Sequence, residues 1–327
     1  MPVYNVENYI RQALDSLLSQ TFTNWEAIIV DDGSTDNSGV ICDQYAARDE
    51  RLKVVHQKNG GQSSARNKAL SLSKGKYITF VDSDDWLNTD HLAVLRDILI
   101  QTDADVAQTS FFKDYRGFQR KKILVDNLTV IEGEKVYDYI MKNSSFPGFL
   151  WNKIFKREVI ISPFIEGRIY EDFMALTEWS QVIRKIAMTP LPTYHYRMRE
   201  GSSMSQNSTR NFLTFLEAHK IRAKKFQEKF PRLFNDEING VYLFSNFVKI
   251  AKYIARAETD TKLRLDTVAQ IARQLNNVKE YDTLPLKKKL RDRGLLLLSS
   301  PENFIKKMRR AGKLDLYTKF CNSRRYE

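Results

Sequence analysis

Cysteine, glycine, proline and long apolar runs are all scarce in this 327-residue sequence. The only two cysteines, Cys42 and Cys321, lie nearly a whole chain apart, which excludes a disulfide scaffold and a thiolate zinc site and predicts a reducing compartment. With 13 glycines, 8 prolines and 42% hydrophobic residues, the composition is that of a folded globular protein. No window approaches the ~18 to 20 apolar residues of a membrane span, and the N-terminus lacks a signal-peptide layout. We therefore expect a cytoplasmic protein.

The positive charge is concentrated at the C-terminus. The net charge is +12, and residues 285–327 hold thirteen basic and four acidic residues, so +9 lies in this tail and +3 in the preceding 284 residues. A nucleic-acid-binding protein would spread its basic residues over one face, so nucleic acid is not the expected partner. Phe304, Ile305, Met308 and Gly312 share one face of a predicted helix flanked by Lys and Arg. This pattern predicts an interfacial helix on an anionic membrane surface, or a solvated basic helix that packs onto the protein body.

Strand-like and helix-period segments alternate over the first 110 residues. Strands are expected near 26–30, 52–56, 77–81 and 105–110, separated by helices, which predicts βαβ units and a parallel sheet. The chain begins directly before the first predicted helix, so the first strand is either very short or truncated. Residues 111–200 look mixed, with a hairpin-like stretch at 113–126, and the pattern beyond residue 208 is helical.

Two acidic clusters follow two of these predicted strands. Asp31 and Asp32 end one strand, and Asp82, Asp84 and Asp85 end another. Ligands of open parallel sheets bind at the carboxyl ends of the strands. Alternation along an extended segment puts Asp82 and Asp84 on one side, where they could share a hard cation such as Mn²⁺ or Mg²⁺ that neutralises a departing diphosphate. Helix capping is the alternative role for such residues.

Six short segments carry a resemblance to a known family. They read PVYN at 2–5, QTF at 20–22, VDDGSTD at 30–36, GQSSARN at 61–67, GKY at 75–77 and VDSDD at 81–85. In this order and spacing they resemble the family-two glycosyltransferases, strongly to about residue 110 and more weakly to about residue 205. The resemblance implies an α/β, Rossmann-type A-fold (GT-A) with a mostly parallel sheet flanked by helices. It also implies inverting, metal-dependent transfer of a sugar from a UDP-sugar to a saccharide hydroxyl, in the synthesis of bacterial surface polysaccharides such as capsule.

The same resemblance divides the chain. Residues 1–205 are expected to form the transferase domain, with a donor half over about 1–110 and an acceptor half over about 111–205. Residues 206–327 are expected to form a helical C-terminal region that ends in the basic tail. A lipid-linked acceptor would place the enzyme on the inner face of the cell membrane.

On the donor side, the resemblance gives roles to five residues. Pro2 and Tyr4 match a platform for uracil, although Tyr4 could instead be a core aromatic. Asp32 matches the carboxylate that holds the base or ribose. Arg66 lies close to the nucleotide, and a guanidinium there could bind phosphate or form an internal ion pair with the aspartates. Asp82 is expected to reach the ribose or the metal.

Four further residues are expected around the metal and the diphosphate. Asp84 matches the direct metal ligand, and His195 stands where some relatives supply a third ligand, although a lone His in a strand is more often a hydrogen-bonded core residue. Arg199 and Ser202 are apt phosphate donors on a loop that closes over the diphosphate.

On the acceptor side, Asp172 matches the family's base, which takes the proton from the attacking hydroxyl. It lies at the start of a predicted helix, where the positive helix end would keep the carboxylate ionised; a purely structural helix charge is the alternative, and Glu171 is the fallback base. Trp151 and Lys153 resemble a segment that lines the acceptor, although Trp151 could equally belong to the core.

Two other enzyme interpretations remain open. A sugar nucleotidyltransferase would share the parallel sheet and acidic site, but it would carry a Gly-rich basic loop after the first strand, which residues 4–8 lack. A catalytically inactive relative is the other alternative.

Overall fold

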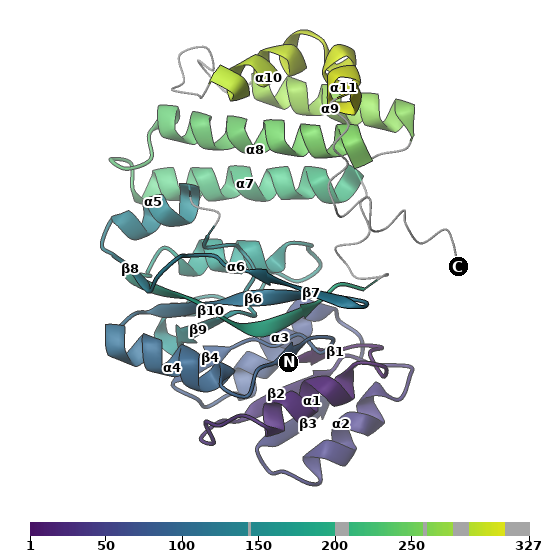
Figure 1. Ribbon diagram of the computed structural model, residues 1–327, viewed down its shortest axis with the longest axis vertical. Coiled ribbons are helices and arrows are strands. Elements are labelled where there is room, and N and C mark those ends of the chain that lie inside the picture. Colours follow the sequence, from purple (N-terminus) through teal and green to yellow (C-terminus); the bar gives the residue numbers. More distant parts are fainter. Residues whose placement is uncertain (143–144, 200–208, 258–259, 277–287, 311–327) are drawn as a thin grey trace. The chain divides into compact units, whose positions relative to one another are not determined.

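The computed structural model describes residues 1–142, 145–199, 209–257, 260–276 and 288–310 (Figure 1). The chain divides into two compact units, Met1–Ser202 and Ser203–Glu327. The first unit combines sheets and helices, and the described part of the second unit is helical.

The first unit contains a three-stranded parallel sheet in the order β1-β2-β3. Its strands are β1 (Pro2–Val3), β2 (Ala27–Asp31) and β3 (Leu52–His56). Three helices follow these strands in turn: α1 (Ile10–Leu18), α2 (Ser38–Ala46) and α3 (Gln62–Leu72). Strand β1 pairs Pro2 with Val30 and Val3 with Asp31.

A second sheet of seven strands completes this unit. Its main path is β4 (Tyr77–Thr79), β9 (Lys153–Lys156), β6 (Val106–Tyr115), β10 (Lys185–Arg197) and β5 (Trp86–Leu87). Strand β7 (Phe118–Lys122) pairs with β6, and β8 (Thr129–Glu132) pairs with β10. The remaining helices of the unit are α4 (His91–Thr102), α5 (Lys135–Lys142), the 3₁₀ turn Arg157–Val159 and α6 (Glu171–Trp179).

The α/β architecture with helices flanking the sheets and a helical C-terminal region is confirmed. Parallel pairing occurs in the three-stranded sheet and between β6 and β10, whereas the other pairs of the second sheet are antiparallel. The two acidic clusters therefore end strands of different sheets. The sequence could not reveal this, because a strand buried on both faces reads as a continuous apolar run whatever the direction of its neighbours.

One hydrophobic cluster joins the two sheets. Ile10, Leu14 and Leu17 recur at helical spacing on α1 and are almost fully buried, as the periodicity predicts. They belong to the same cluster as Ile29 of β2 and Tyr194 of β10. Val81, directly before the second acidic cluster, belongs to the same core, which holds the two acidic segments in one rigid unit because well-packed interiors deform little.

The second unit is built from five described helices. They are α7 (Thr209–Lys229), α8 (Asp236–Ala257), α9 (Thr261–Asn276), α10 (Lys288–Ser299) and α11 (Pro301–Arg310). Helix α10 approaches α8 closely at Gly294, where an added Cβ would lie 1.9 Å from Cζ of Phe244. No helix in the described ranges combines the length and the apolar composition that crossing a bilayer requires.

Of the two roles expected for α11, the structure shows a helix whose apolar side chains pack onto the protein body. Phe304, Ile305 and Met308 are 0 to 6% exposed and pack into the core of the second unit with Phe244 and Phe247. The apolar face is thus already covered by protein and cannot insert into lipid. Gly312 and the rest of the tail after residue 310 lie outside the described residues.

Candidate active site

The first acidic cluster holds the loop that leads into α3. Asp32 is buried, and its carboxylate accepts hydrogen bonds from Nε2 of Gln57 (2.7 Å) and from the backbone N–H groups of Gly60 (2.9 Å) and Gly61 (2.8 Å). Gly61 has φ +85°, a conformation that disfavours other residues. Asp32 thereby fixes the start of α3, and its predicted contact with the nucleotide stays a prediction.

Arg66 of α3 connects three carboxylates. Its side chain is 3% exposed; Nη1 donates to Oε1 of Glu171 (2.7 Å) and Oδ1 of Asp172 (2.7 Å), and Nη2 donates to Oδ1 of Asp82 (2.9 Å). The interpretation of Arg66 as an internal ion-pair partner is therefore what the structure shows. The guanidinium joins the acidic segment after β4 to the first turn of α6.

Asp172 lies in the first turn of α6 and pairs with Arg66. Helix α6 begins at Glu171, directly after Tyr170, which adopts a left-handed conformation with φ 63°. Burial raises the pKa of Asp172 to about 7; the charge of Arg66 opposes this rise, and the carboxylates of Glu171 and Asp82 add to it. A carboxyl group that titrates near neutral pH suits general base catalysis.

The three aspartates after β4 have different surroundings. Asp82 and Asp84 keep 20% and 21% of their side-chain surface exposed, and Oδ2 of Asp84 pairs with Nε of Arg199 at 2.6 Å. Asp85 is buried, accepting hydrogen bonds from the Tyr194 hydroxyl (2.9 Å) and the Arg197 backbone N–H (2.7 Å). Asp85 therefore anchors the end of β10, and only Asp82 and Asp84 remain accessible to a ligand.

The chemistry of Asp82 and Asp84 fits a hard divalent cation, since both present carboxylate oxygens beside solvent. Within the described ranges, no group of three or more His, Cys, Asp and Glu side chains could hold a metal ion alone. The diphosphate and water would have to supply the remaining ligands. In this structure the Arg199 guanidinium pairs with Asp84 and offsets its negative charge.

The geometry does not present His195 as a third metal ligand. Its ring is stacked between those of Trp86 (4.7 Å) and Phe112 (4.6 Å). Nε2 is 2.8 Å from Oδ1 of Asn88, and Nδ1 is 3.1 Å from Oδ2 of Asp114. Both ring nitrogens already have partners, and burial lowers the pKa of the imidazole, so His195 is a neutral, hydrogen-bonded residue of the sheet.

Cations and aromatic rings surround the end of β10. The Arg197 guanidinium lies over the rings of Trp86 (4.4 Å) and Tyr9 (5.1 Å), and that of Arg199 lies over Tyr9 (5.2 Å). These two side chains are well placed to meet a diphosphate beside Asp84. Ser202 lies outside the described residues.

The start of the chain presents an aromatic ring beside this region. Tyr4 directly follows β1 and is 49% exposed, whereas Pro2 is buried within the strand. Tyr4 is thus not a core aromatic, and its predicted stacking on uracil stays a prediction.

The predicted acceptor residues Trp151 and Lys153 are both buried. Trp151 is 5% exposed and stacks on Phe149 and Tyr194. Nζ of Lys153 donates to the carbonyl oxygens of Pro147 (3.0 Å) and Phe149 (2.7 Å), and burial keeps its pKa well below the usual range. Neither side chain presents itself to an acceptor; both support the loop that carries Phe149.

Tyr194 is the site residue that the motifs missed. Its hydroxyl donates to Asp85 and accepts a hydrogen bond from the backbone N–H of Asp82 (3.2 Å), so it locks the acidic segment onto β10. An aromatic residue in an apolar strand gives no signal of this role.

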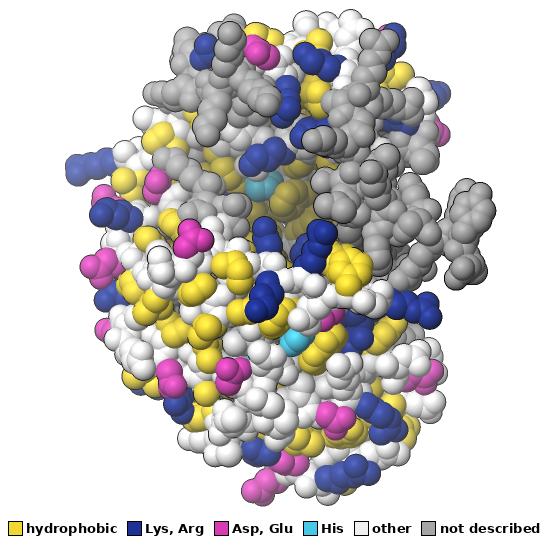
Figure 2. All heavy atoms as spheres, in the orientation of Figure 1, with side chains coloured by type: hydrophobic (Ala, Val, Ile, Leu, Met, Phe, Trp, Pro, Cys, Tyr) yellow, Lys and Arg dark blue, Asp and Glu magenta, His cyan; other side chains and the backbone are white. Residues whose placement is uncertain are grey.

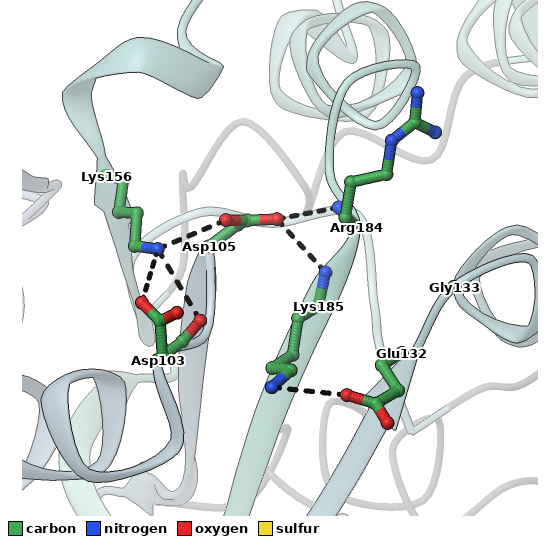
Figure 3. A pocket seen from close by; sticks show the side chains of 7 residues that line it. All are labelled: Asp103, Asp105, Glu132, Gly133, Lys156, Arg184 and Lys185. Carbon is green, nitrogen blue, oxygen red and sulfur yellow. Dashed lines mark hydrogen bonds and ion pairs between the residues drawn. The ribbon is translucent and has the colours of Figure 1, made fainter.

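A hollow of about 490 Å³ lies at the amino ends of β6 and β10 (Figure 3). There Lys156 pairs with Asp103 and Asp105, and Lys185 pairs with Glu132. Because these charges neutralise one another at the opposite end of the strands from Arg197, this hollow is an ion-paired surface and not the candidate site.

Comparisons with known proteins identify the family of this chain. The family model described as "Glycosyl transferase family 2" matches residues 1–161. Glycosyltransferase GlyG of Streptococcus pneumoniae is 34% identical over 217 residues, covering 62% of this chain and 71% of GlyG. Glycosyltransferase GlyA of the same organism is 34% identical over 211 residues, and this chain spans only 30% of its length. The putative glycosyltransferase EpsH of Bacillus subtilis is 33% identical, with 69% of this chain and 67% of EpsH covered.

Solved structures show the same fold. The crystal structure of S. aureus TarS 1-349 in complex with UDP-GlcNAc superposes with a TM-score of 0.71 at 22% identity, covering 95% of this chain and 90% of TarS 1-349. The fold is thus of the GT-A type. The chain belongs to glycosyltransferase family 2.

Proposed function

We propose that this glycosyltransferase is an inverting, metal-dependent enzyme that moves a sugar from a UDP-sugar to a hydroxyl of a saccharide acceptor. The Arg66 network carries the proposal, since one buried guanidinium holds Asp82 on the donor side and Asp172 on the acceptor side. Asp172, the proposed base, is therefore connected to Asp82 of the acidic segment through one guanidinium.

In the proposed reaction, Asp172 accepts the proton of the acceptor hydroxyl as its oxygen attacks the anomeric carbon. The nucleoside diphosphate departs from the opposite face, so an α-linked donor gives a β-linked product. A cation held by Asp82 and Asp84, when bound, would supply charge neutralisation for the departing diphosphate. Arg197 and Arg199 donate hydrogen bonds to its phosphate oxygens, and Tyr4 stacks on the base.

The structural relatives support a nucleotide-sugar donor and a metal. TarS is described in complex with UDP-GlcNAc and with UDP, and a Pyrobaculum calidifontis mannosyltransferase with a TM-score of 0.52 is described with GDP-Man and Mn²⁺. A hexose or an N-acetylhexosamine is accordingly the proposed sugar. A role in capsular or related cell-surface glycan synthesis is supported by a relative described as a putative teichuronic acid biosynthesis glycosyltransferase, 47% identical over 92 residues.

The donor half of the proposal is tested by UDP binding with and without Mn²⁺, measured by calorimetry. Wild-type protein should bind UDP more tightly when Mn²⁺ is present, and Asp84→Asn should abolish this difference because a ligand charge is lost. Tyr4→Ala should weaken UDP binding about 5- to 100-fold at either metal condition, the cost of losing one stacked base.

Ile100→Ala is the matched control for Tyr4→Ala, because Ile100 is comparably exposed on α4, and it should leave UDP binding unchanged. Wild-type protein that binds no UDP with Mn²⁺ would instead indicate an inactive relative. If Mn²⁺ strengthened UDP binding by Asp84→Asn as much as by the wild type, the proposed metal site at Asp84 would be contradicted.

We also propose that the acceptor is lipid-linked and that the enzyme works at the inner face of the cell membrane. Exposed Lys306 and Lys307 of α11 support electrostatic contact with anionic headgroups. Lys306→Glu/Lys307→Glu should reduce cosedimentation with phosphatidylglycerol vesicles, with no change for phosphatidylcholine vesicles. Identical sedimentation of the variant and the wild type would remove α11 from the membrane contact.

A further inference from the structure

The hairpin of β6 and β7 gathers positive charge on one face. Cross-strand partners share a face of an antiparallel pair, and the register pairs Lys113 with Arg120, Tyr115 with Phe118 and Phe111 with Lys122. Lys113, Arg120 and Lys122 therefore lie on the same side as the Tyr115–Phe118 pair. We call these five residues the cationic hairpin face.

These three cations have no counter-charge in the described part of the chain. The hairpin's own carboxylate, Asp114, lies on the opposite side, where it contacts Gln119 and His195. All of β7 is exposed, and burial together with the charge of Lys122 lowers the pKa of Lys113. Like charges placed across from one another destabilise a sheet, so an anionic ligand would relieve a repulsion that the described residues leave uncompensated.

Aromatic contacts connect this face to the acceptor side. Phe111, which precedes the cations on β6, packs edge-on against Phe149 (5.5 Å) and Trp151 (4.8 Å). Phe149 follows Gly148, and a Cβ on Gly148 would lie 2.7 Å from Cδ2 of Phe173. Phe173 is the neighbour of Asp172, so a short chain of packed residues runs from the hairpin to the candidate base.

The hairpin face also offers a surface for sugar rings. The rings of Tyr115 and Phe118 are stacked at 4.5 Å and 7°, and Phe118 is 42% exposed. In the middle of the face shown in Figure 2, where Figure 1 draws β6 and β7, Lys and Arg side chains lie next to hydrophobic ones. Flat apolar rings beside cations suit a glycan that carries charge, because both parts of such a ligand find partners.

We propose that the cationic hairpin face binds the acceptor, and that this acceptor is a saccharide chain bearing phosphate or carboxylate groups. This inference rests on the proposed function, since it names the acceptor class of the same site. Charge on the acceptor complements Lys113, Arg120 and Lys122. The packed residues Phe111, Phe149 and Phe173 connect the hairpin to the segment that carries Asp172. If the hairpin face bound a membrane surface instead, it would not have to be connected to the segment of Asp172.

The test measures binding of three fluorescently labelled probes by anisotropy: a glycerol phosphate oligomer, an oligogalacturonate and a neutral dextran of similar length. Wild-type protein should bind at least one anionic probe about tenfold more tightly than dextran. Arg120→Gln/Lys122→Gln should weaken that binding about three- to tenfold, the size expected for two exposed charge contacts. The preference should also shrink with added salt.

Arg48→Gln/Lys135→Gln is the matched control, because it removes the same charge from exposed positions elsewhere in the first unit. Equal weakening by both double variants, or equal binding of dextran and the anionic probes, would overturn the proposal. So would an Arg120→Gln/Lys122→Gln variant that loses binding to phosphatidylglycerol vesicles and keeps binding to both glycans. UDP binding by the wild-type protein is measured in parallel. Loss of UDP binding would contradict the proposed function, whereas loss of glycan preference alone would contradict only the acceptor proposal.

Discussion

Asp172→Asn is expected to lower kcat for sugar transfer by about 10²- to 10⁴-fold, the contribution of a positioned general base. The amide keeps the shape of the side chain but cannot accept the proton of the acceptor hydroxyl. KM for the donor should change little, because Asp172 contacts Arg66 and not the predicted nucleotide platform at Tyr4. Steady-state transfer rates, with UDP binding as the check on folding, measure this effect.

The wild-type pH profile provides an independent signature of the same group. The pKa of Asp172 is raised to about 7 by burial, so the base is protonated and inactive below that pH. The kcat/KM for transfer should therefore rise with pH and level off above about 7. Glu178→Gln, on the same helix α6, is the matched control and should keep both the rate and the profile. An Asp172→Asn variant with wild-type kcat would remove Asp172 from the role of base and leave Glu171 as the candidate.

The sequence predicted the acidic ends of β2 and β4 and the helix that carries Asp172, because these depend on local order: a buried run, a cluster of carboxylates, then a helix. It left open whether Arg66 serves the nucleotide or the aspartates. The decisive contacts lie 105 and 106 residues away along the chain, and no local pattern reports a pairing at that distance.

Several side chains that could face a ligand or lipid are buried in the structure, and the reason is the same for each. For His195, Trp151 and the apolar face of α11, the sequence leaves a ligand-facing or lipid-facing role open beside a role in the core. For Lys153 it favours an acceptor-lining role. Burial decides between such roles, and burial depends on what packs against a residue. Phe304 shows this most clearly, since the face that would enter a membrane is filled by Phe244 and Phe247 of another helix.

Arg66→Met is expected to lower the free energy of unfolding of the first unit by about 3–5 kcal/mol, the cost of breaking a buried ion pair by removing one partner. Methionine fills much of the same volume, so the loss is electrostatic: Asp82, Glu171 and Asp172 remain together without a counter-charge. Differential scanning calorimetry at pH 8 measures the effect. Arg96→Met is the matched control, because Arg96 is about a third exposed and its partner Asp97 about half, and exposed pairs contribute about 0–1 kcal/mol.

The pH dependence separates this electrostatic cause from a packing defect. In Arg66→Met the clustered carboxylates should have folded-state pKa values above their unfolded values, so the folded state binds protons more readily. Stability is then retained at low pH and lost as pH rises through the folded-state pKa values. The destabilisation should be smaller at pH 5 than at pH 8. Arg66→Lys keeps the positive charge but lacks the planar guanidinium that binds several carboxylates at once, so its stability should lie between those of Arg66→Met and the wild type. A deficit that is equal at both pH values would mean that Arg66 acts through its packing alone, and the donor and acceptor carboxylates would then be coupled by something other than this guanidinium.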